Sequence, residues 1–230
     1  GQHAPGVQDI EQTVRAAHHL LLSHGMAVPV IRRNSPGAEV GIVLNANYML
    51  PASSSKADRD AARIGDGMWV RWFLDPLHGR QYPSDIVAHY ENQVGRPVMG
   101  FVQAGDFDEI AVPLDFVGLN YYMRQVVRAN VPHAANEPPV VVADGERTEM
   151  GWEVYPDGLF NLLSRFHNEY QIPKLYVTEN GASYSTGPDA DGRVRDVKRT
   201  QYLRDHYISA KQAIDAGVPL AGYFVWSLLD

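Results

Sequence analysis

Leu175-Tyr176-Val177-Thr178-Glu179-Asn180-Gly181 gives the strongest indication of fold in this chain of 230 residues. Its first four residues are typical of a buried strand, and Asn180-Gly181 is a common turn signal. Glu179 is therefore a lone carboxylate at the point where a strand ends. In parallel α/β folds, ligands and catalytic groups collect at the carboxyl ends of the strands. Glu179 is thus the first candidate for a catalytic residue.

Three further segments have the same organisation, an apolar strand followed by polar residues. They are residues 40–50, 115–122 and 220–226, and helices are predicted at about 9–33, 58–74, 84–90, 157–170 and 196–217. Near-continuous apolar strands that alternate with helices indicate a parallel sheet covered by helices. Because an eight-stranded α/β barrel needs about 250 residues, the four units predict part of a (β/α)8 barrel. We expect one domain over residues 1–230.

Capping residues and apolar spacing predict where the helices begin and which side they bury. Asp9 with Gln12 is expected to begin the first helix, and Asp157 to cap the helix before Glu179. Residues 123–150 are expected to form an extended loop with a hairpin near Asp144-Gly145. One side of the last helix is expected to carry the residues Leu203, Tyr207, Ala210 and Ile214.

The bulk composition is that of an ordinary globular protein, with 45% hydrophobic and 20% charged residues. A net charge of −7 argues against a nucleic-acid-binding surface, which would normally be basic. The absence of cysteine excludes disulfides and thiolate metal sites, and no apolar run is long enough to cross a membrane. We expect no cofactor or metal, and no nucleic-acid or membrane partner. The compartment stays open, with the cytoplasm favoured.

The polar residues at the four strand ends share a chemistry that suits a sugar. Amides, phenols and a carboxylate bind hydroxyl groups directionally, and an indole stacks on the C–H face of the ring. No Gly-rich phosphate loop and no Gly-x-Ser-x-Gly nucleophile elbow occurs in the chain. The strand-end residues are Asn45, Asn47, Asn120, Tyr121, Tyr122, Glu179, Asn180, Trp226 and Ser227.

Six motifs in order resemble those of family 1 glycoside hydrolases, the β-glucosidase family. The resemblance covers nearly the whole chain, and six ordered motifs are far more specific than any one of them. They are His3-Ala4-Pro5-Gly6, Ala16-Ala17-His18-His19 with His24-Gly25, residues 115–122, Met150-Gly151-Trp152-Glu153 with Tyr155-Pro156, Thr178-Glu179-Asn180-Gly181, and residues 223–230.

This resemblance implies a (β/α)8 barrel, of which the chain would hold roughly strands 5 to 8 with their helices and the helix after strand 4. It implies hydrolysis of terminal β-D-glucosyl residues by double displacement, with retention of configuration. Glu179 would be the nucleophile, and Tyr122 would hydrogen-bond its carboxylate. Asn120 would lie at the sugar-facing strand end, and Trp226 would stack beneath the glycone.

Retention needs a second carboxylate, and the resemblance implies that this acid/base glutamate lies upstream of Gly1, in an Asn-Glu-Pro motif. Asn136-Glu137-Pro138 has the same residues, but no strand leads into it, so we do not assign it this role. Two interpretations remain open: the catalytic half of a retaining β-glucosidase, or a non-catalytic sugar-binding or interaction fragment. The expected partners are a β-glucoside or short β-linked oligosaccharide, and either the missing N-terminal half or a second copy.

Some residues keep a structural interpretation beside the functional one. Trp226 has a core-aromatic interpretation as the alternative to stacking, which we favour, and Trp152 either lies near the aglycone side or packs in the interior. His18, His19 and His24 are expected to be structural helix residues, because adjacent helix positions diverge by about 100° and no acidic residue lies at metal-ligand spacing.

Overall fold

The structure is a computed structural model that describes residues 5–134 and 137–227. Its contacts divide the chain into two compact units, and each is described by itself. The first comprises Gly1–Val40, Pro51–Leu114 and Val127–Val140, and the second comprises Gly41–Leu50, Asp115–Val126 and Val141–Asp230. The expectation of one domain stays a prediction. No helix in the described ranges is long and apolar enough to cross a membrane.

The first unit is helical. Its elements are α1 (Ile10–Asn34), α2 (Lys56–Asp66), the π-helix η1 (Gly67–Arg71), α3 (Trp72–Leu77), α4 (Ser84–Val94) and α5 (Asp106–Ile110). Asp9 caps α1 as predicted, since its carboxylate accepts a hydrogen bond from the Gln12 backbone N–H at 2.8 Å. The helix predicted at 58–74 is observed as α2, η1 and α3 in direct succession, and α5 was not predicted.

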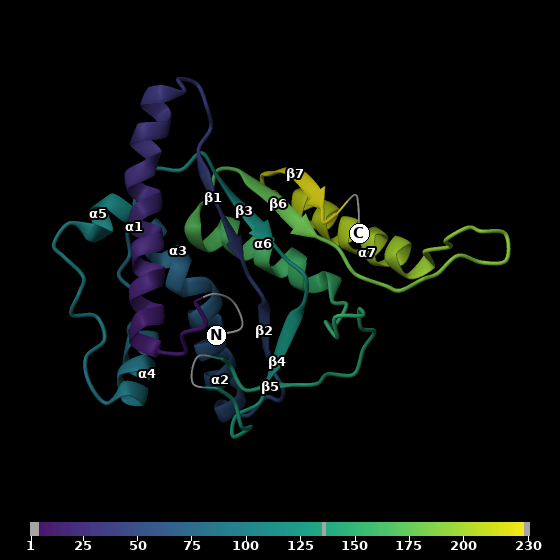
Figure 1. Cartoon of the computed structure of the whole chain (residues 1–230), viewed down its shortest axis with the longest axis horizontal. Helices are drawn as coiled ribbons and strands as arrows, with labels where there is room; N and C mark the ends of the chain where they lie inside the picture. The colour runs from purple at the N-terminus through teal and green to yellow at the C-terminus, as the bar shows by residue number, and fades with distance from the viewer. Residues whose placement is uncertain (1–4, 135–136, 228–230) are drawn as a thin grey trace. The chain divides into compact units, whose positions relative to one another are not determined.

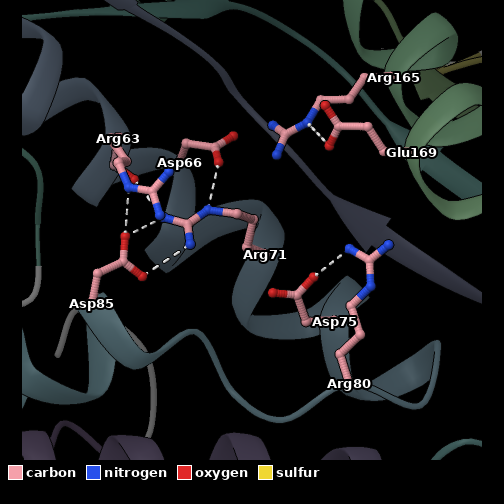
Figure 2. A network of polar contacts seen from close by, with 8 residues as sticks. All are labelled: Arg63, Asp66, Arg71, Asp75, Arg80, Asp85, Arg165 and Glu169. Carbon is pink, nitrogen blue, oxygen red and sulfur yellow. Dashed lines mark hydrogen bonds and ion pairs between the residues drawn. The ribbon is translucent and has the colours of Figure 1, made fainter.

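Arg71 ends the π-helical turn and joins it to α2 and α4 by ion pairs (Figure 2). Its guanidinium donates to both carboxylate oxygens of Asp85, at 3.0 and 2.9 Å, and to Asp66 at 3.1 Å. Arg63 reaches the same Asp85 at 2.9 Å. Because the Arg71 side chain is only 13% exposed, these partners replace most of the water that the charge loses on burial.

The second unit is built on a parallel sheet, with the strand order β1-β3-β6-β7 (Figure 1). A smaller sheet has the order β2-β4-β5. Helices α6 and α7 pack against each other, and α7 contacts β7. The elements are β1 (Gly41–Asn45), β2 (Tyr48–Pro51), β3 (Phe116–Asn120), β4 (Arg124–Val127), β5 (Val140–Val141), α6 (Pro156–Tyr170), β6 (Leu175–Asn180), α7 (Val197–Asp215) and β7 (Leu220–Val225).

The parallel α/β fold predicted from the sequence is confirmed, but several local predictions were wrong. The strand expected at 40–50 is two strands, because β1 pairs with β3 in the parallel sheet whereas β2 belongs to the smaller sheet. The loop expected at 123–150 contains β4 and β5. Its hairpin is closed by an antiparallel bridge between Arg147 and Glu153 rather than near Asp144-Gly145.

Two predictions about helices also needed correction. Tyr155, and not Asp157, occupies the N-cap of α6, and Pro156 fills its first helical position. On α7, Tyr207 and Ile214 are exposed, and both are 46% accessible. Ala210 is buried as predicted, and the other buried residues of α7 are Tyr202, His206, Ser209 and Ala213.

Candidate active site

Strand register brings the polar strand ends of the second unit side by side. Asn45 in β1 pairs with Asn120 in β3, and Asn120 pairs with Glu179 in β6. The Thr178 hydroxyl donates to the side-chain oxygen of Asn120 at 2.7 Å, which fixes that amide. The carboxyl edge of the sheet therefore presents two amides and one carboxylate in a row.

Glu179 is held by the phenol of Tyr122, a residue that follows β3. The Tyr122 hydroxyl donates to Glu179 Oε2 at 2.6 Å, a distance typical of a strong bond to an ionised acceptor. Burial, together with this hydrogen bond and the negative charge of Glu179, raises the pKa of Tyr122 far above its ordinary value. Tyr122 therefore remains a hydrogen-bond donor, and Glu179 Oε1 is the oxygen that it does not contact.

Asn180 anchors the strand end directly behind Glu179. Its side chain is fully buried, and its Nδ2 group donates to the Tyr121 carbonyl at 2.7 Å and to the Tyr202 hydroxyl at 3.0 Å. The Tyr223 hydroxyl donates to Asn180 Oδ1 at 2.5 Å, and Tyr202 donates to the Tyr122 carbonyl at 3.4 Å. The Asn180 amide thus connects β6 with the end of β3, with β7 and with α7. Tyr202 on α7 bonds both to this amide, next to Glu179, and to the backbone carbonyl of Tyr122.

Trp226 follows β7 and lies beside this strand end. Its backbone N–H donates to the Asn180 carbonyl at 3.0 Å, and its side chain is 62% exposed. A side-chain carbon at Gly181 would overlap the Trp226 carbonyl oxygen, so glycine permits the close approach of the two segments. Among the described residues the indole of Trp226 is exposed, so it is available to a ligand.

A cavity of about 310 Å³ opens next to the Tyr122–Glu179 pair. Within it, the rings of Tyr122 and Trp152 have centroids 5.1 Å apart. Its walls are mostly apolar and aromatic, as in small-ligand sites where a few polar groups fix orientation. The lining residues are Tyr122, Met150, Trp152, Gly181, Ala182, Ser183 and Trp226.

All four site residues predicted from the sequence therefore lie in the second unit. Tyr122 touches Glu179, Asn120 neighbours it by register, and Trp226 is tied to Asn180. Residues 1–4, 136 and 228–230, which carry parts of three predicted motifs, lie outside the described residues. The described ranges hold no cluster of three or more His, Cys, Asp or Glu residues placed to bind a metal.

Two of the α1 histidines predicted to be structural, His18 and His19, have hydrogen-bond partners within the first unit. His18 is 1% exposed, and its ring nitrogens lie 3.0 Å from the Tyr82 hydroxyl and 3.0 Å from Asp106. Sequence spacing gave no sign of this acidic partner, because Asp106 lies far along the chain. His19 bonds to the Arg15 carbonyl of its own helix at 2.7 Å.

Sequence reasoning missed the groups that hold the site in place. Tyr202 lies on α7 and Tyr223 on β7, and no sequence motif predicted that their hydroxyl groups bond to Asn180. Arg124 and Glu153 form a buried ion pair across 29 positions. The sequence offered one indication of this pair: Arg124 lies two residues after Tyr122, and Glu153 directly follows Trp152.

Comparison with known proteins identifies the family of this chain. The sequence profile of glycosyl hydrolase family 1 matches residues 1–230. The chain belongs to this family. The family 1 chain is 35% identical over 232 residues to beta-glucosidase A of Acetivibrio thermocellus, and 40% identical over 231 residues to beta-glucosidase A of Thermotoga maritima. Each alignment covers 100% of this chain, and 51% and 50% of the relative.

Solved structures give the same result for the fold. The AHE enzyme from Alicyclobacillus herbarius superimposes with a TM-score of 0.89 at 43% identity, covering 98% of this chain and 49% of that one. A family 1 β-glucosidase from Thermotoga maritima, in complex with isofagomine lactam, gives a TM-score of 0.88 at 39% identity, covering 98% and 50%. The family 1 chain thus spans about half the length of the relatives it matches, and the predicted partial barrel is confirmed.

Proposed function

We propose that this chain carries the nucleophile side of a retaining β-glycosidase site that hydrolyses terminal non-reducing β-D-glucosyl residues. The observation that carries the proposal is the 2.6 Å hydrogen bond from Tyr122 to Glu179 at the carboxyl edge of the parallel sheet. Relatives described as β-glucosidases support the glycone class. A carboxylate at this edge, oriented by a phenol and flanked by an amide, is suited to attack on an anomeric carbon.

In the proposed mechanism, Glu179 Oε1 attacks the anomeric carbon while the bond to the leaving oxygen breaks. The product is a glycosyl ester of Glu179, and Tyr122 keeps the carboxylate in the attacking orientation. Asn120 hydrogen-bonds a sugar hydroxyl, and the exposed indole of Trp226 stacks under the apolar face of the glycone. Water then cleaves the ester with a second inversion, so that the β configuration is retained.

A retaining mechanism also needs an acid/base carboxylate about 5 Å from the nucleophile. In the described part of the second unit, Tyr122 bonds to one carboxylate, that of Glu179. The second interpretation, a non-catalytic sugar-binding or interaction fragment, therefore stays a candidate for the 230 residues taken alone. No cofactor is proposed. The proposed partners are a β-glucoside or short β-linked oligosaccharide, together with the family's other half or a second copy, and the proposed compartment is the cytoplasm.

An activated substrate with added azide separates the two candidates. 2,4-Dinitrophenyl β-glucoside needs no proton on its leaving group, so Glu179 can form the glycosyl ester without an acid. Azide then attacks that ester, and the expected product is β-glucosyl azide at a rate that rises with azide concentration. The Glu179→Ala variant is expected to give the α-azide by direct displacement. If neither the native chain nor this variant forms a glucosyl azide, the fragment does not catalyse the reaction.

A further inference from the structure

A bidentate ion pair joins Arg124 to Glu153 beside the cavity. Arg124 Nε donates to Glu153 Oε2 at 2.7 Å, and its Nη2 donates to Oε1 at 2.8 Å. The side chains are 16% and 7% exposed. The guanidinium also lies 3.9 Å from the centre of the Tyr155 ring. Both carboxylate oxygens are therefore occupied by one planar donor group, an arrangement that fixes direction as well as distance.

The two partners stand next to the two aromatic walls of the cavity. Arg124 begins β4, two residues after Tyr122, and β4 pairs with β2 in the smaller sheet. Glu153 directly follows Trp152, in the hairpin that the Arg147–Glu153 bridge closes. The ion pair thus links the segment that bears Tyr122 to the segment that bears Trp152.

The hairpin is shaped to receive the Glu153 carboxylate. A side-chain carbon at Gly145 would lie 2.8 Å from Glu153 Oε1, so only glycine leaves the carboxylate its full space. Arg147 closes the same hairpin by donating to the carbonyl groups of Gly151 and Ala143, at 2.8 and 2.6 Å. Glu153 is therefore held in one place by backbone geometry on one side and by Arg124 on the other.

We propose that Arg124 and Glu153 are positioning residues that set the separation of Tyr122 and Trp152, and with it the affinity of the site for substrate. The inference rests on the proposed function for its kinetic consequence. Neither residue lines the cavity, so both act through their aromatic neighbours. Because β4 is paired within a sheet and the hairpin is not part of one, loss of the ion pair moves Trp152 rather than Tyr122.

Four changes test this, and each disturbs the pair differently. Glu153→Gln removes one charge, and Arg124→Lys keeps the charge but loses the planar fork. Gly145→Ala keeps both charges and displaces the carboxylate. The double variant Arg124→Met/Glu153→Leu replaces the pair by apolar side chains, which restores stability lost when a single buried charge is left behind. Glu169→Gln, which breaks the half-exposed Arg165–Glu169 pair on α6, is the matched control.

The first readout does not depend on catalysis. In the full chain labelled with 5-fluorotryptophan, the four tryptophans give four fluorine resonances, and Trp152→Phe assigns one. We expect the Trp152 resonance to shift or broaden in all four variants, with the Trp69 and Trp72 resonances unchanged. Glu169→Gln is expected to leave all four resonances in place.

The second readout is the rate of covalent labelling by a 2-deoxy-2-fluoro-β-glucoside with a dinitrophenolate leaving group. In the variants, the concentration for half-maximal rate should rise about three- to tenfold, equivalent to one lost aromatic contact. The maximal rate should stay within about twofold of the native rate, because Tyr122 still bonds to Glu179.

The outcomes separate the two proposals. If the native chain is not labelled, the proposed function fails, and the fluorine spectra alone decide the role of the ion pair. If the native chain is labelled and the folded double variant shows the native Trp152 resonance and the native half-maximal concentration, the pair is only structural and this inference is overturned.

Discussion

One hydrogen bond, from the Tyr122 hydroxyl to Glu179, sets the orientation of the proposed nucleophile. A carboxylate at a strand end rotates freely unless a donor selects one oxygen, and Tyr122 selects Oε2. The selection leaves Oε1 as the oxygen that would attack. The bond is worth more than an ordinary one because its acceptor is ionised.

Replacing Tyr122 by Phe tests this bond directly. The ring and its contact with Trp152 remain, while the donor to Glu179 is lost. Because hydrogen bonds to charged groups contribute about 1.5 to 3 kcal/mol, we expect the maximal labelling rate by the fluoroglucoside to fall roughly 10- to 100-fold. The half-maximal concentration should change little.

Tyr90→Phe is the control for Tyr122→Phe, since it removes a phenol hydroxyl in the first unit, from a residue that is 8% exposed. It should leave the labelling rate unchanged. An equal rate in Tyr122→Phe and the native chain would show that the phenol has no part in orienting Glu179.

Gly181 supports the site through its lack of a side chain. Gly181→Ala places a carbon against the backbone carbonyl of Trp226, which cannot rotate away. Overpacking of this kind costs roughly 1 to 3 kcal/mol, so we expect a lower melting temperature and a higher half-maximal concentration for labelling. Gly187→Ala, at a glycine with open space around it, should behave as the native chain does. A native melting temperature in Gly181→Ala would contradict the close approach.

Among the elements, α7 shows why burial could not be read from apolar spacing. The side of this helix that faces inward carries Tyr202 and His206, which are 1% and 0% exposed, and their rings stack at 4.0 Å. Hydrogen bonds offset part of the cost of burying these polar rings, since Tyr202 bonds to Asn180 and His206 Nδ1 donates to the Tyr202 carbonyl at 2.8 Å. Among the described residues, His206 Nε2 is buried without a hydrogen-bond partner. The helix is therefore coupled to the strand end that carries Glu179.

His206 makes the stability of the second unit depend on pH. Burial lowers its pKa from 6.5 to about 4, so the folded state holds the ring neutral while the unfolded state takes up a proton below pH 6.5. The stability that the neutral ring contributes is fully present above pH 6.5 and is lost as the pH falls towards 4. The loss reaches about 3 kcal/mol.

Urea unfolding of the native chain and of His206→Gln, at several pH values between 7 and 4, measures this effect. The difference in unfolding free energy between the two should shrink by that amount as the pH falls. A difference that stays constant across this range would mean that His206 titrates alike in both states.

In the first unit, we expect the ion pairs of Arg71 to stabilise α2, η1 and α4. Arg71→Met leaves Asp66 and Asp85 without their main partner, which costs roughly 3 to 5 kcal/mol for a buried pair. We expect faster amide hydrogen exchange throughout α2, η1 and α4. Arg96→Met breaks an ion pair whose arginine is 67% exposed and should cost less than about 1 kcal/mol. Equal protection of these amides from exchange in Arg71→Met and in the native chain would contradict the stabilising role of Arg71.

The sequence predicted the regular parts of the fold because they follow from local patterns. Apolar runs ending in polar residues predicted β1, β3, β6 and β7, and the capping role of Asp9 followed from its position. Glu179, Tyr122, Asn120 and Trp226 could be proposed as site residues because each belongs to a motif at a strand end.

What could not be predicted depends on contacts between distant residues. β1 and β2 are separate strands because they pair in different sheets, and the π-helical turn has no periodicity of its own. The bond of Asn180 to Tyr202 and Tyr223 joins three elements, and so does not follow from the spacing within any one of them.

At the scale of the whole molecule, the chain spans about half the length of its β-glucosidase relatives and contributes one candidate catalytic carboxylate. General acid catalysis typically contributes about 10²- to 10⁴-fold. We therefore expect the 230 residues alone to turn over cellobiose at least that much more slowly than a full-length relative, with a smaller deficit for dinitrophenyl β-glucoside. Parallel assays on both substrates measure this, and an equal deficit on both would contradict the missing-acid explanation.

Mass spectrometric mapping of the chain after incubation with a dinitrophenyl 2-deoxy-2-fluoro-β-glucoside identifies the residue that attacks the anomeric carbon. We expect one fluoroglucosyl adduct, located on Glu179, that is absent from the Glu179→Gln variant. An adduct on a different residue, or no adduct in a folded sample at saturating reagent, would contradict the assignment of Glu179 as the nucleophile.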